Sequence, residues 1–153
     1  MPLIEGCGGS IDKYLGDGIL ASFGAVRPSA TYAADLCRAI DVVAAGAARW
    51  RDGRERRHAP APAVVMAGAS GEVTFGIVGH ETRLEYTVIG EVVNLVAKLE
   101  KHAKQEAVQA LTTAETYALA AVQGYRASPA AEARPGRRVD GVAGPVNLVV
   151  LPG

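Results

Sequence analysis

The stretch SIDKYLGDGILASF, residues 10–23, decides the first part of the fold. Ser10–Leu15 and Ile19–Phe23 are typical of strands, and residues 16–18 between them have the composition of a tight turn. We therefore expect a β-hairpin with Asp17 in its turn. A carboxylate beside two glycines can approach a metal ion or a metal–phosphate complex. The same Asp-Gly chemistry is also common in hairpins that bind nothing.

A second stretch, RLEYTVIGEVVNLVAKLE at residues 83–100, indicates a strand that runs into a helix. Leu84–Ile89 is rich in β-branched residues, a glycine breaks the run, and Glu91–Lys104 has helical periodicity. Asn94 and Lys98 are four residues apart, so both project from one helix face. An amide beside an ammonium can orient a sugar and neutralise a phosphate. An ordinary solvated helix face is the alternative.

The remaining pattern predicts an α+β chain with hairpins. A long apolar stripe after Pro28 predicts a helix that ends near Gly53. We expect short strands at 63–67 and 72–78, joined as a hairpin near Gly68 to Gly71, further strands at 108–112 and 146–151, and a short helix at 113–122 capped by Thr113. Segments 54–62 and 128–138 are expected to be loops.

Length and composition restrict the class of protein. The 153 residues fit one domain, spanning 1–153, and the 49% hydrophobic and 21% charged content excludes wholesale disorder. Sixteen basic and sixteen acidic residues give zero net charge, which argues against a nucleic acid polymer as partner. No signal peptide or membrane-spanning segment is evident. Two cysteines without ligand spacing favour a reduced, cytoplasmic setting.

Two further groups of residues are candidate binding sites. The three histidines share no metal-ligand spacing, so scattered surface positions are the expected outcome. A basic cluster holds five arginines, diluted by Asp52 and Glu55. It is interpreted as a solvated loop, with contact to an anion or a partner as the alternative. The arginines are Arg49, Arg51, Arg54, Arg56 and Arg57.

Three segments in a fixed order resemble the class III nucleotide cyclase catalytic domain. They are DKYLGDGILASFGA (12–25), AGASGEVTFGIVG (67–79) and RLEYTVIGEVVNLVAKLE (83–100). The resemblance covers nearly the whole chain, from about Gly9 to Leu151. It implies a ferredoxin-like cyclase palm, in which a sheet derived from a βαββαβ unit carries the helices.

The resemblance also implies a reaction. Members of the family form cyclic nucleotide when the ribose 3′-hydroxyl attacks the α-phosphate and pyrophosphate leaves. Two divalent ions, Mg²⁺ or Mn²⁺, assist this step. The site lies between two catalytic domains, so a homodimer or a heterodimer with another cyclase domain is implied.

Site residues follow from the resemblance position by position. Asp17 matches a metal ligand, and Lys13 and Thr87 match the pair that recognises adenine. Asn94 matches the asparagine that orients the ribose. Lys98 lies at the position that stabilises phosphate charge. Guanine-specific relatives usually carry glutamate at the position of Lys13. The resemblance therefore implies an adenylate cyclase that converts ATP to 3′,5′-cyclic AMP.

Three departures from the family pattern qualify this prediction. The first strand, which carries the other metal aspartate, and the first two helices are expected to be missing, so the domain is interpreted as N-terminally truncated. The hairpin at 10–23 and the strand after the long helix would then lose a shared neighbour. Asp12 is expected to point away from Lys13, because neighbours on a strand face opposite sides, and so cannot replace that aspartate.

The other two departures concern the phosphate region. Lys98 stands where the family usually has arginine, and Asp140 lies near the place where it often has a lysine. Lysine keeps the charge of arginine but loses its planar fork of donors. The alternative prediction is therefore a catalytically impaired, nucleotide-binding or regulatory cyclase-like module that pairs with a complete cyclase domain.

Overall fold

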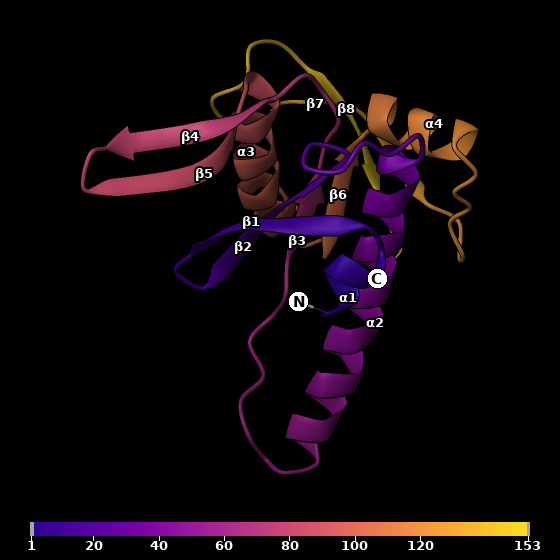
Figure 1. Cartoon of the computed structure of the whole chain (residues 1–153). Helices are drawn as coiled ribbons and strands as arrows, with labels where there is room; N and C mark the ends of the chain where they lie inside the picture. Colours follow the sequence, from indigo (N-terminus) through magenta and orange to yellow (C-terminus); the bar gives the residue numbers. More distant parts are fainter. Residues whose placement is uncertain (1, 153) are drawn as a thin grey trace.

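The computed structural model describes residues 2–152 and shows the expected α+β fold (Figure 1). Its elements, in chain order, are α1 (Pro2–Gly6), β1 (Gly9–Leu15), β2 (Gly18–Phe23), α2 (Tyr32–Glu55), β3 (Met66–Gly68), β4 (Thr74–His80), β5 (Arg83–Ile89), α3 (Glu91–Gln105), β6 (Ala110–Thr113), α4 (Ala114–Val122), β7 (Glu132–Arg137) and β8 (Val146–Val150).

A four-stranded sheet with the order β3-β6-β8-β7 forms the centre of the molecule. Strand β3 is parallel to β6, and the other pairs are antiparallel. Because neighbouring strand residues face opposite sides, Ala110 and Val149 pack with α2 and α4, whereas Leu111 and Leu148 pack with α3. The sheet therefore lies between α2 and α4 on one face and α3 on the other.

Side-chain caps fix two of the helices. Thr113 caps α4 as predicted, since its Oγ1 accepts a hydrogen bond from the Thr116 amide at 3.1 Å. The start of α2 is capped by a side chain from a segment about 90 positions later in the sequence. Gln123 Oε1 accepts from the amides of Ala33 and Ala34 at 2.8 and 3.1 Å. These two bonds tie the start of α2 to the end of α4 and so orient α2, the longest of the described helices.

The structure differs from the expected pattern in three places. Helix α1 was not predicted, and strand β7 lies inside the predicted loop at 128–138. Pro135 and Gly136 argue against a strand, but β7 is an edge strand with an irregular register between Arg134 and Arg137, where proline is tolerated. The expected hairpin around Gly68 to Gly71 is wrong: β3 pairs with β6, and β4 pairs with β5.

Two hairpins stand apart from the central sheet. Strands β1 and β2 form the predicted hairpin, and β4 and β5 form a second one that projects from the body (Figure 1). Within residues 2–152, β2 pairs only with β1 and β3 only with β6. Both strands line one mainly apolar groove of about 230 Å³. The resemblance implies that the β1–β2 hairpin and strand β3 share a neighbouring strand. Both elements face this groove.

Candidate functional site

Two predicted site residues meet between the hairpins. Lys13 lies on β1 and Thr87 on β5, 74 positions apart in the sequence. The Lys13 ammonium donates a hydrogen bond to Thr87 Oγ1 at 3.0 Å, and both residues are half-buried. The structure thus joins an ammonium and a hydroxyl into one polar cluster.

Asp12 belongs to the same cluster, which corrects the expectation that it points away from Lys13. Thr87 Oγ1 donates to Asp12 Oδ2 at 3.2 Å, and the Val88 amide donates to the same oxygen at 3.4 Å. The reason is a register shift between Ile11 and Lys13, where β1 carries one residue more than β2. Such a bulge interrupts the alternation of faces. The alternation of residue types in the sequence of β1 does not reveal this bulge.

These contacts fix the direction of the Thr87 hydroxyl. A hydroxyl has one proton and two lone pairs. The carboxylate of Asp12 is nearer to the hydroxyl than the Val88 carbonyl, which lies 3.5 Å away. A charged acceptor also binds the proton more strongly than a carbonyl does. The Thr87 oxygen therefore accepts from Lys13 and keeps one lone pair for a further donor.

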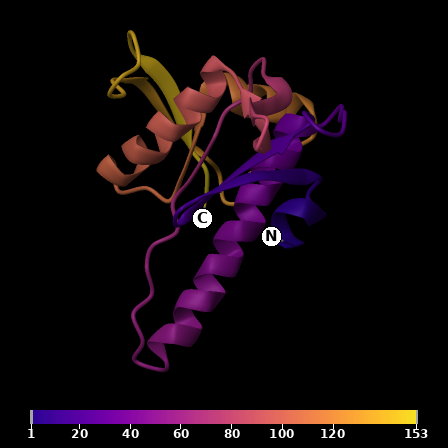
Figure 2. The ribbon, with the colours of Figure 1, turned by 60° about the vertical axis from the view of Figure 1, so that its left-hand side comes forward.

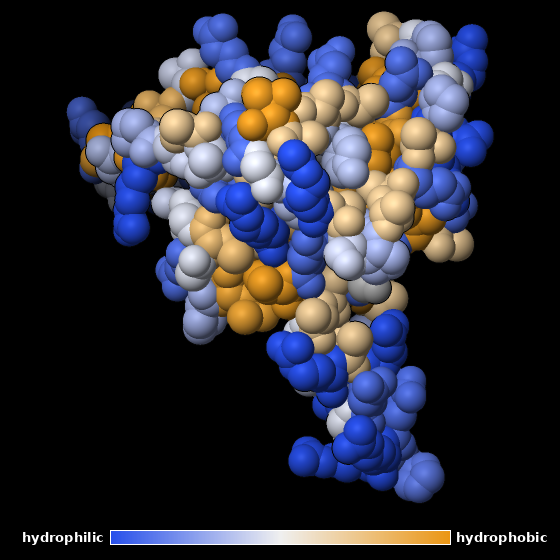
Figure 3. Space-filling view, turned by 90° about the vertical axis from the view of Figure 1, so that its right-hand side faces the viewer, coloured by the Kyte–Doolittle hydropathy of each residue, from blue (hydrophilic) through white to orange (hydrophobic). Residues whose placement is uncertain are grey.

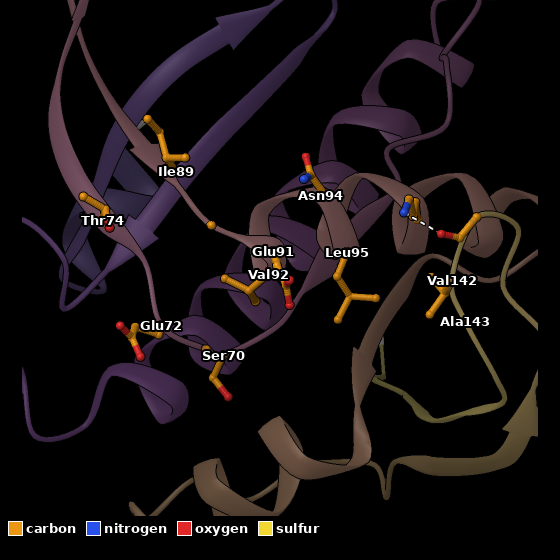
Figure 4. A pocket seen from close by; sticks show the side chains of 14 residues that line it. Ser70, Glu72, Thr74, Ile89, Glu91, Val92, Asn94, Leu95, Val142 and Ala143 are labelled. Atoms are coloured by element: carbon orange, nitrogen blue, oxygen red, sulfur yellow. Dashed lines mark hydrogen bonds between the residues drawn. The ribbon is translucent and has the colours of Figure 1, made fainter.

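The other predicted pair, Asn94 and Lys98, lines a pocket of about 790 Å³ (Figure 4). Helix α3 carries both side chains, and its start at Gly90 lies against the backbone after β3. A Cβ at Gly90 would come within 2.7 Å of the Glu72 carbonyl oxygen, so only glycine allows this approach. The remaining lining residues are Ser70, Gly71, Glu72, Thr74, Ile89, Glu91, Val92, Leu95, Gly141, Val142 and Ala143.

Lys98 contacts the turn before β8. Its Nζ donates to the Gly141 carbonyl oxygen at 2.6 Å, the dashed line in Figure 4. Asp140 in the same turn accepts from Gln105 Nε2 at 3.2 Å. The turn at Asp140 lacks the lysine that the family often has there, but Lys98 places an ammonium against it. Sequence reasoning missed Gly141 because a backbone acceptor 43 positions away leaves no signal in the sequence.

The charges in this pocket limit what it can bind alone. Its charged lining residues are Glu72, Glu91 and Lys98, two carboxylates and one ammonium. Such a lining repels a polyanion unless cations accompany it. An anionic ligand would therefore enter this pocket together with bound cations.

Asp17 lies apart from both pairs. It is exposed in the turn between β1 and β2 and lines neither the pocket nor the groove. Its charge reaches Lys104 near the end of α3. The pKa of Lys104 is raised mainly by its hydrogen bond to Glu100, with a smaller contribution from Asp17. Among residues 2–152, no group of three histidine, cysteine or acidic side chains could hold a metal ion.

Comparisons with known proteins show where the same fold and similar sequences occur. The adenylyl cyclase CyaB from P. aeruginosa superposes with a TM-score of 0.72 at 23% identity, covering 99% of this chain and 76% of that structure. The guanylyl cyclase Cya2 gives 0.70 at 25% identity, covering 97% and 72%. An adenylate cyclase of Anabaena cylindrica is 34% identical over 116 residues, 72% of this chain and 22% of that protein. No family model matches the sequence.

The chain belongs to the class III nucleotide cyclase catalytic domains. The solved structures with a similar fold include an adenylyl cyclase and a guanylyl cyclase. The cyclase chain spans about a fifth of the length of the curated relatives it matches first. Among residues 2–152, no helix combines the length and apolar character that a membrane span needs.

Proposed function

We propose that this chain is an adenylate cyclase catalytic domain, which converts ATP to 3′,5′-cyclic AMP and pyrophosphate. One observation carries the adenine assignment: Lys13, Thr87 and Asp12 form a hydrogen-bonded cluster between β1 and β5. The name of the Anabaena relative supports the same substrate.

The cluster presents a donor beside an acceptor of fixed direction. Adenine has a donor at its exocyclic N6 amino group and an acceptor at N1, and guanine has the reverse arrangement. We place the Thr87 oxygen against N6 and the Lys13 ammonium against N1. Guanine in this orientation would set its O6 lone pairs against an oxygen whose proton Asp12 holds. The N1–H of guanine would also meet the Lys13 ammonium, so Asp12 and Lys13 both disfavour guanine.

The ribose and phosphates would lie in the pocket of α3. Asn94 orients the ribose, and Lys98 neutralises phosphate charge. An ammonium has three N–H groups, so the bond from Lys98 to Gly141 leaves two donors for phosphate oxygens. In the reaction the O3′–Pα bond forms, the bond from Pα to the β-phosphate oxygen breaks, and the hydroxyl proton is released. Two donors held at the phosphate stabilise the charge that grows on its oxygens.

A divalent ion, Mg²⁺ or Mn²⁺, is part of this proposal. Mg²⁺ is commonly bound by one or two carboxylates together with substrate phosphates, and Asp17 fits one such position. When bound, the ion would neutralise the triphosphate and promote loss of the 3′-hydroxyl proton. Paramagnetic resonance of Mn²⁺ with ATP tests this role: Asp17→Asn should weaken Mn²⁺ binding in the presence of ATP. Equal binding by the variant would remove Asp17 from the site.

We also propose that two chains share the site. Asp17 lies apart from the pocket of Asn94 and Lys98, which supports ligands from different chains. The projecting β4–β5 hairpin exposes large apolar side chains, with Leu84 at 67% and Tyr86 at 60% exposure. Exposed apolar surface of this kind marks interaction sites. It suits a contact with a second catalytic domain.

Complementation tests the shared site. Asp17→Ala and Asn94→Ala should each abolish cyclic AMP formation when assayed alone. A mixed dimer would contain one intact site, since the intact Asp17 and the intact Asn94 come from different chains. Random mixing of the two variants should then restore about a quarter of the wild-type rate. No restored activity, with both variants folded and dimeric, would contradict a shared site.

The product assay tests the proposed function itself. Purified chain is incubated with ATP and Mn²⁺ or Mg²⁺ over a range of chain concentrations. Cyclic AMP and pyrophosphate should appear in equal amounts. A complete absence of cyclic AMP at every concentration counts against catalysis by this chain.

Lys98 favours a second candidate function, a nucleotide-binding module with little activity that pairs with a complete cyclase domain. A lysine cannot make the planar, two-pronged contact of an arginine to a phosphate. Calorimetry separates the two functions: this module binds ATP, alone or with a complete cyclase domain, but forms no cyclic AMP. Undetectable ATP binding in both settings would exclude it.

A further inference from the structure

The distal end of α2 forms a basic arm that the cyclase site does not use. We define the arm as residues 49–58 at the end of α2 and the turn that follows. The last buried residue of α2 is Ala44, and the distal end of the helix projects from the body of the molecule (Figures 1 and 2). At 1.5 Å per residue, the eleven residues that follow Ala44 extend for about 16 Å. The tip is strongly hydrophilic in Figure 3.

Charge is distributed unevenly between the arm and the body. The arm holds five arginines against Asp52 and Glu55, a net charge of +3. Because the whole chain has zero net charge, the remaining residues carry −3. Within residues 2–152, none of the five arm arginines makes an ion pair, whereas arginines of the body do. The arm is therefore a concentrated surface of net positive charge whose arginines form no ion pairs with the described part of the chain.

The tip of the arm has an ordered structure and an aromatic component. Trp50 is the single tryptophan of the chain and is 44% exposed. The Arg54 guanidinium lies over its ring, 5.3 Å from the centroid, and also donates to the Pro60 carbonyl. The Ala59 amide returns to the Arg54 carbonyl at 3.0 Å. These contacts hold the indole, Arg54 and the following segment together.

An apolar segment runs beside the tip. Residues 59–64 read APAPAV, contain no charge, and form neither helix nor strand. Pro60 and Pro62 are exposed. The arm thus combines unpaired guanidinium groups, a half-exposed indole and exposed apolar surface at a convex end.

We propose that the arm binds the surface of an anionic phospholipid bilayer. A guanidinium group can donate two parallel hydrogen bonds to one phosphate group. Indole rings favour the headgroup region of a bilayer. Each basic residue near an anionic leaflet adds to the attraction. The acidic body is repelled by the same leaflet, so the arm points toward it. A nucleic acid would satisfy the arginines and could stack its bases on the indole, but it offers no apolar layer for the APAPAV segment.

Trp50 reports the contact directly. Full-length chain is titrated with phosphatidylcholine vesicles that contain phosphatidylserine, and with pure phosphatidylcholine vesicles. With the anionic vesicles, the Trp50 emission should shift to shorter wavelength and become protected from acrylamide quenching. Salt should reverse both effects, because the attraction is electrostatic. The assay needs no nucleotide, so its outcome is independent of cyclase activity.

Matched variants locate the binding surface. The arm variant, with Arg49, Arg51, Arg56 and Arg57 each replaced by Gln, keeps the Trp50–Arg54 contact and should lower vesicle partitioning at least about a hundredfold. The control variant removes four exposed positive charges from the body, by Arg27→Gln, Arg83→Gln, Lys101→Gln and Arg138→Gln. Since the control makes the body more acidic without touching the arm, its partitioning should fall by less than tenfold.

Four results would overturn the proposal. The first is no emission shift with anionic vesicles. The second is an equal shift with neutral vesicles, which would mean apolar adsorption. The third is an equal loss of binding in the arm and control variants. The fourth is quenching by heparin or RNA with no response to vesicles, which would assign the arm to a soluble polyanion.

Discussion

Replacing Thr87 by valine tests the polar cluster between the hairpins. The change keeps the shape of the side chain and removes its hydroxyl group. That hydroxyl accepts a hydrogen bond from Lys13 at 3.0 Å and donates one to Asp12 at 3.2 Å. A hydrogen bond to a charged group contributes about 1.5–3 kcal/mol. All three residues are half-buried, so water compensates part of the loss. We expect the free energy of unfolding to fall by about 1–2 kcal/mol.

ATP binding should weaken separately, because the Thr87 oxygen is also the proposed acceptor for the adenine amino group. Loss of one neutral hydrogen bond, about 1 kcal/mol, corresponds to roughly a fivefold higher Kd. Calorimetry with ATP and GTP measures it, and urea unfolding measures stability. Thr87→Ser keeps the hydroxyl and should bind ATP within about twofold of wild type. If Thr87→Val binds ATP as tightly as Thr87→Ser does, the hydroxyl does not contact the base.

Asp12→Asn provides the complementary test. The variant removes the charge that holds the Thr87 proton while the ammonium of Lys13 stays in place. The hydroxyl can then turn and donate to guanine O6. We expect the preference for ATP over GTP to fall by about tenfold, equivalent to one charged hydrogen bond at the lower end of its range. An unchanged ratio of the two binding constants would show that Asp12 has no part in selectivity.

Three further predictions concern the fold. Thr113→Ala removes the α4 cap and should lower the free energy of unfolding by about 1 kcal/mol in urea titrations, with Thr113→Ser as the control. Burial raises the pKa of the Cys37 thiol to about 12. A thiol reagent at pH 8 should therefore modify Cys7 in the native protein and Cys37 only after denaturation. Rapid modification of both cysteines in the native protein would contradict the packing of α2. Glu106→Gln breaks the ion pairs of 2.9 and 3.3 Å between Glu106 and two arginines of β7. The free energy of unfolding, measured by heat or urea, should fall by about 1–2 kcal/mol. No measurable change would show that water replaces these ion pairs.

The elements that could be predicted are those with a strong local signal. The β1–β2 hairpin follows from strand runs on either side of a Gly-Asp-Gly turn. Helices α2 and α3 follow from their apolar stripes. The meeting of Lys13 and Thr87 was expected through the family resemblance, because no local pattern connects residues 74 positions apart.

The missed features depend on tertiary context. Asp12 joins the cluster through a bulge, and strands with and without a bulge have the same alternation of residue types. Strand β7 contains Pro135, which is allowed only because the strand lies at the edge of the sheet. His102 was expected at the surface but is buried at the end of α3, 3.4 Å from Glu106. Composition and spacing cannot reveal any of these three, since each is set by a neighbour from another element.

A competition assay tests the central claim most directly. The purified chain receives equal concentrations of ATP and GTP with Mn²⁺, and mass spectrometry measures both cyclic products in the same reaction. The account predicts cyclic AMP as the main product, in equal amount with the pyrophosphate released from ATP. Cyclic GMP as the main product would contradict the role given to Lys13, Thr87 and Asp12. No cyclic product at any chain concentration would contradict the cyclase function itself.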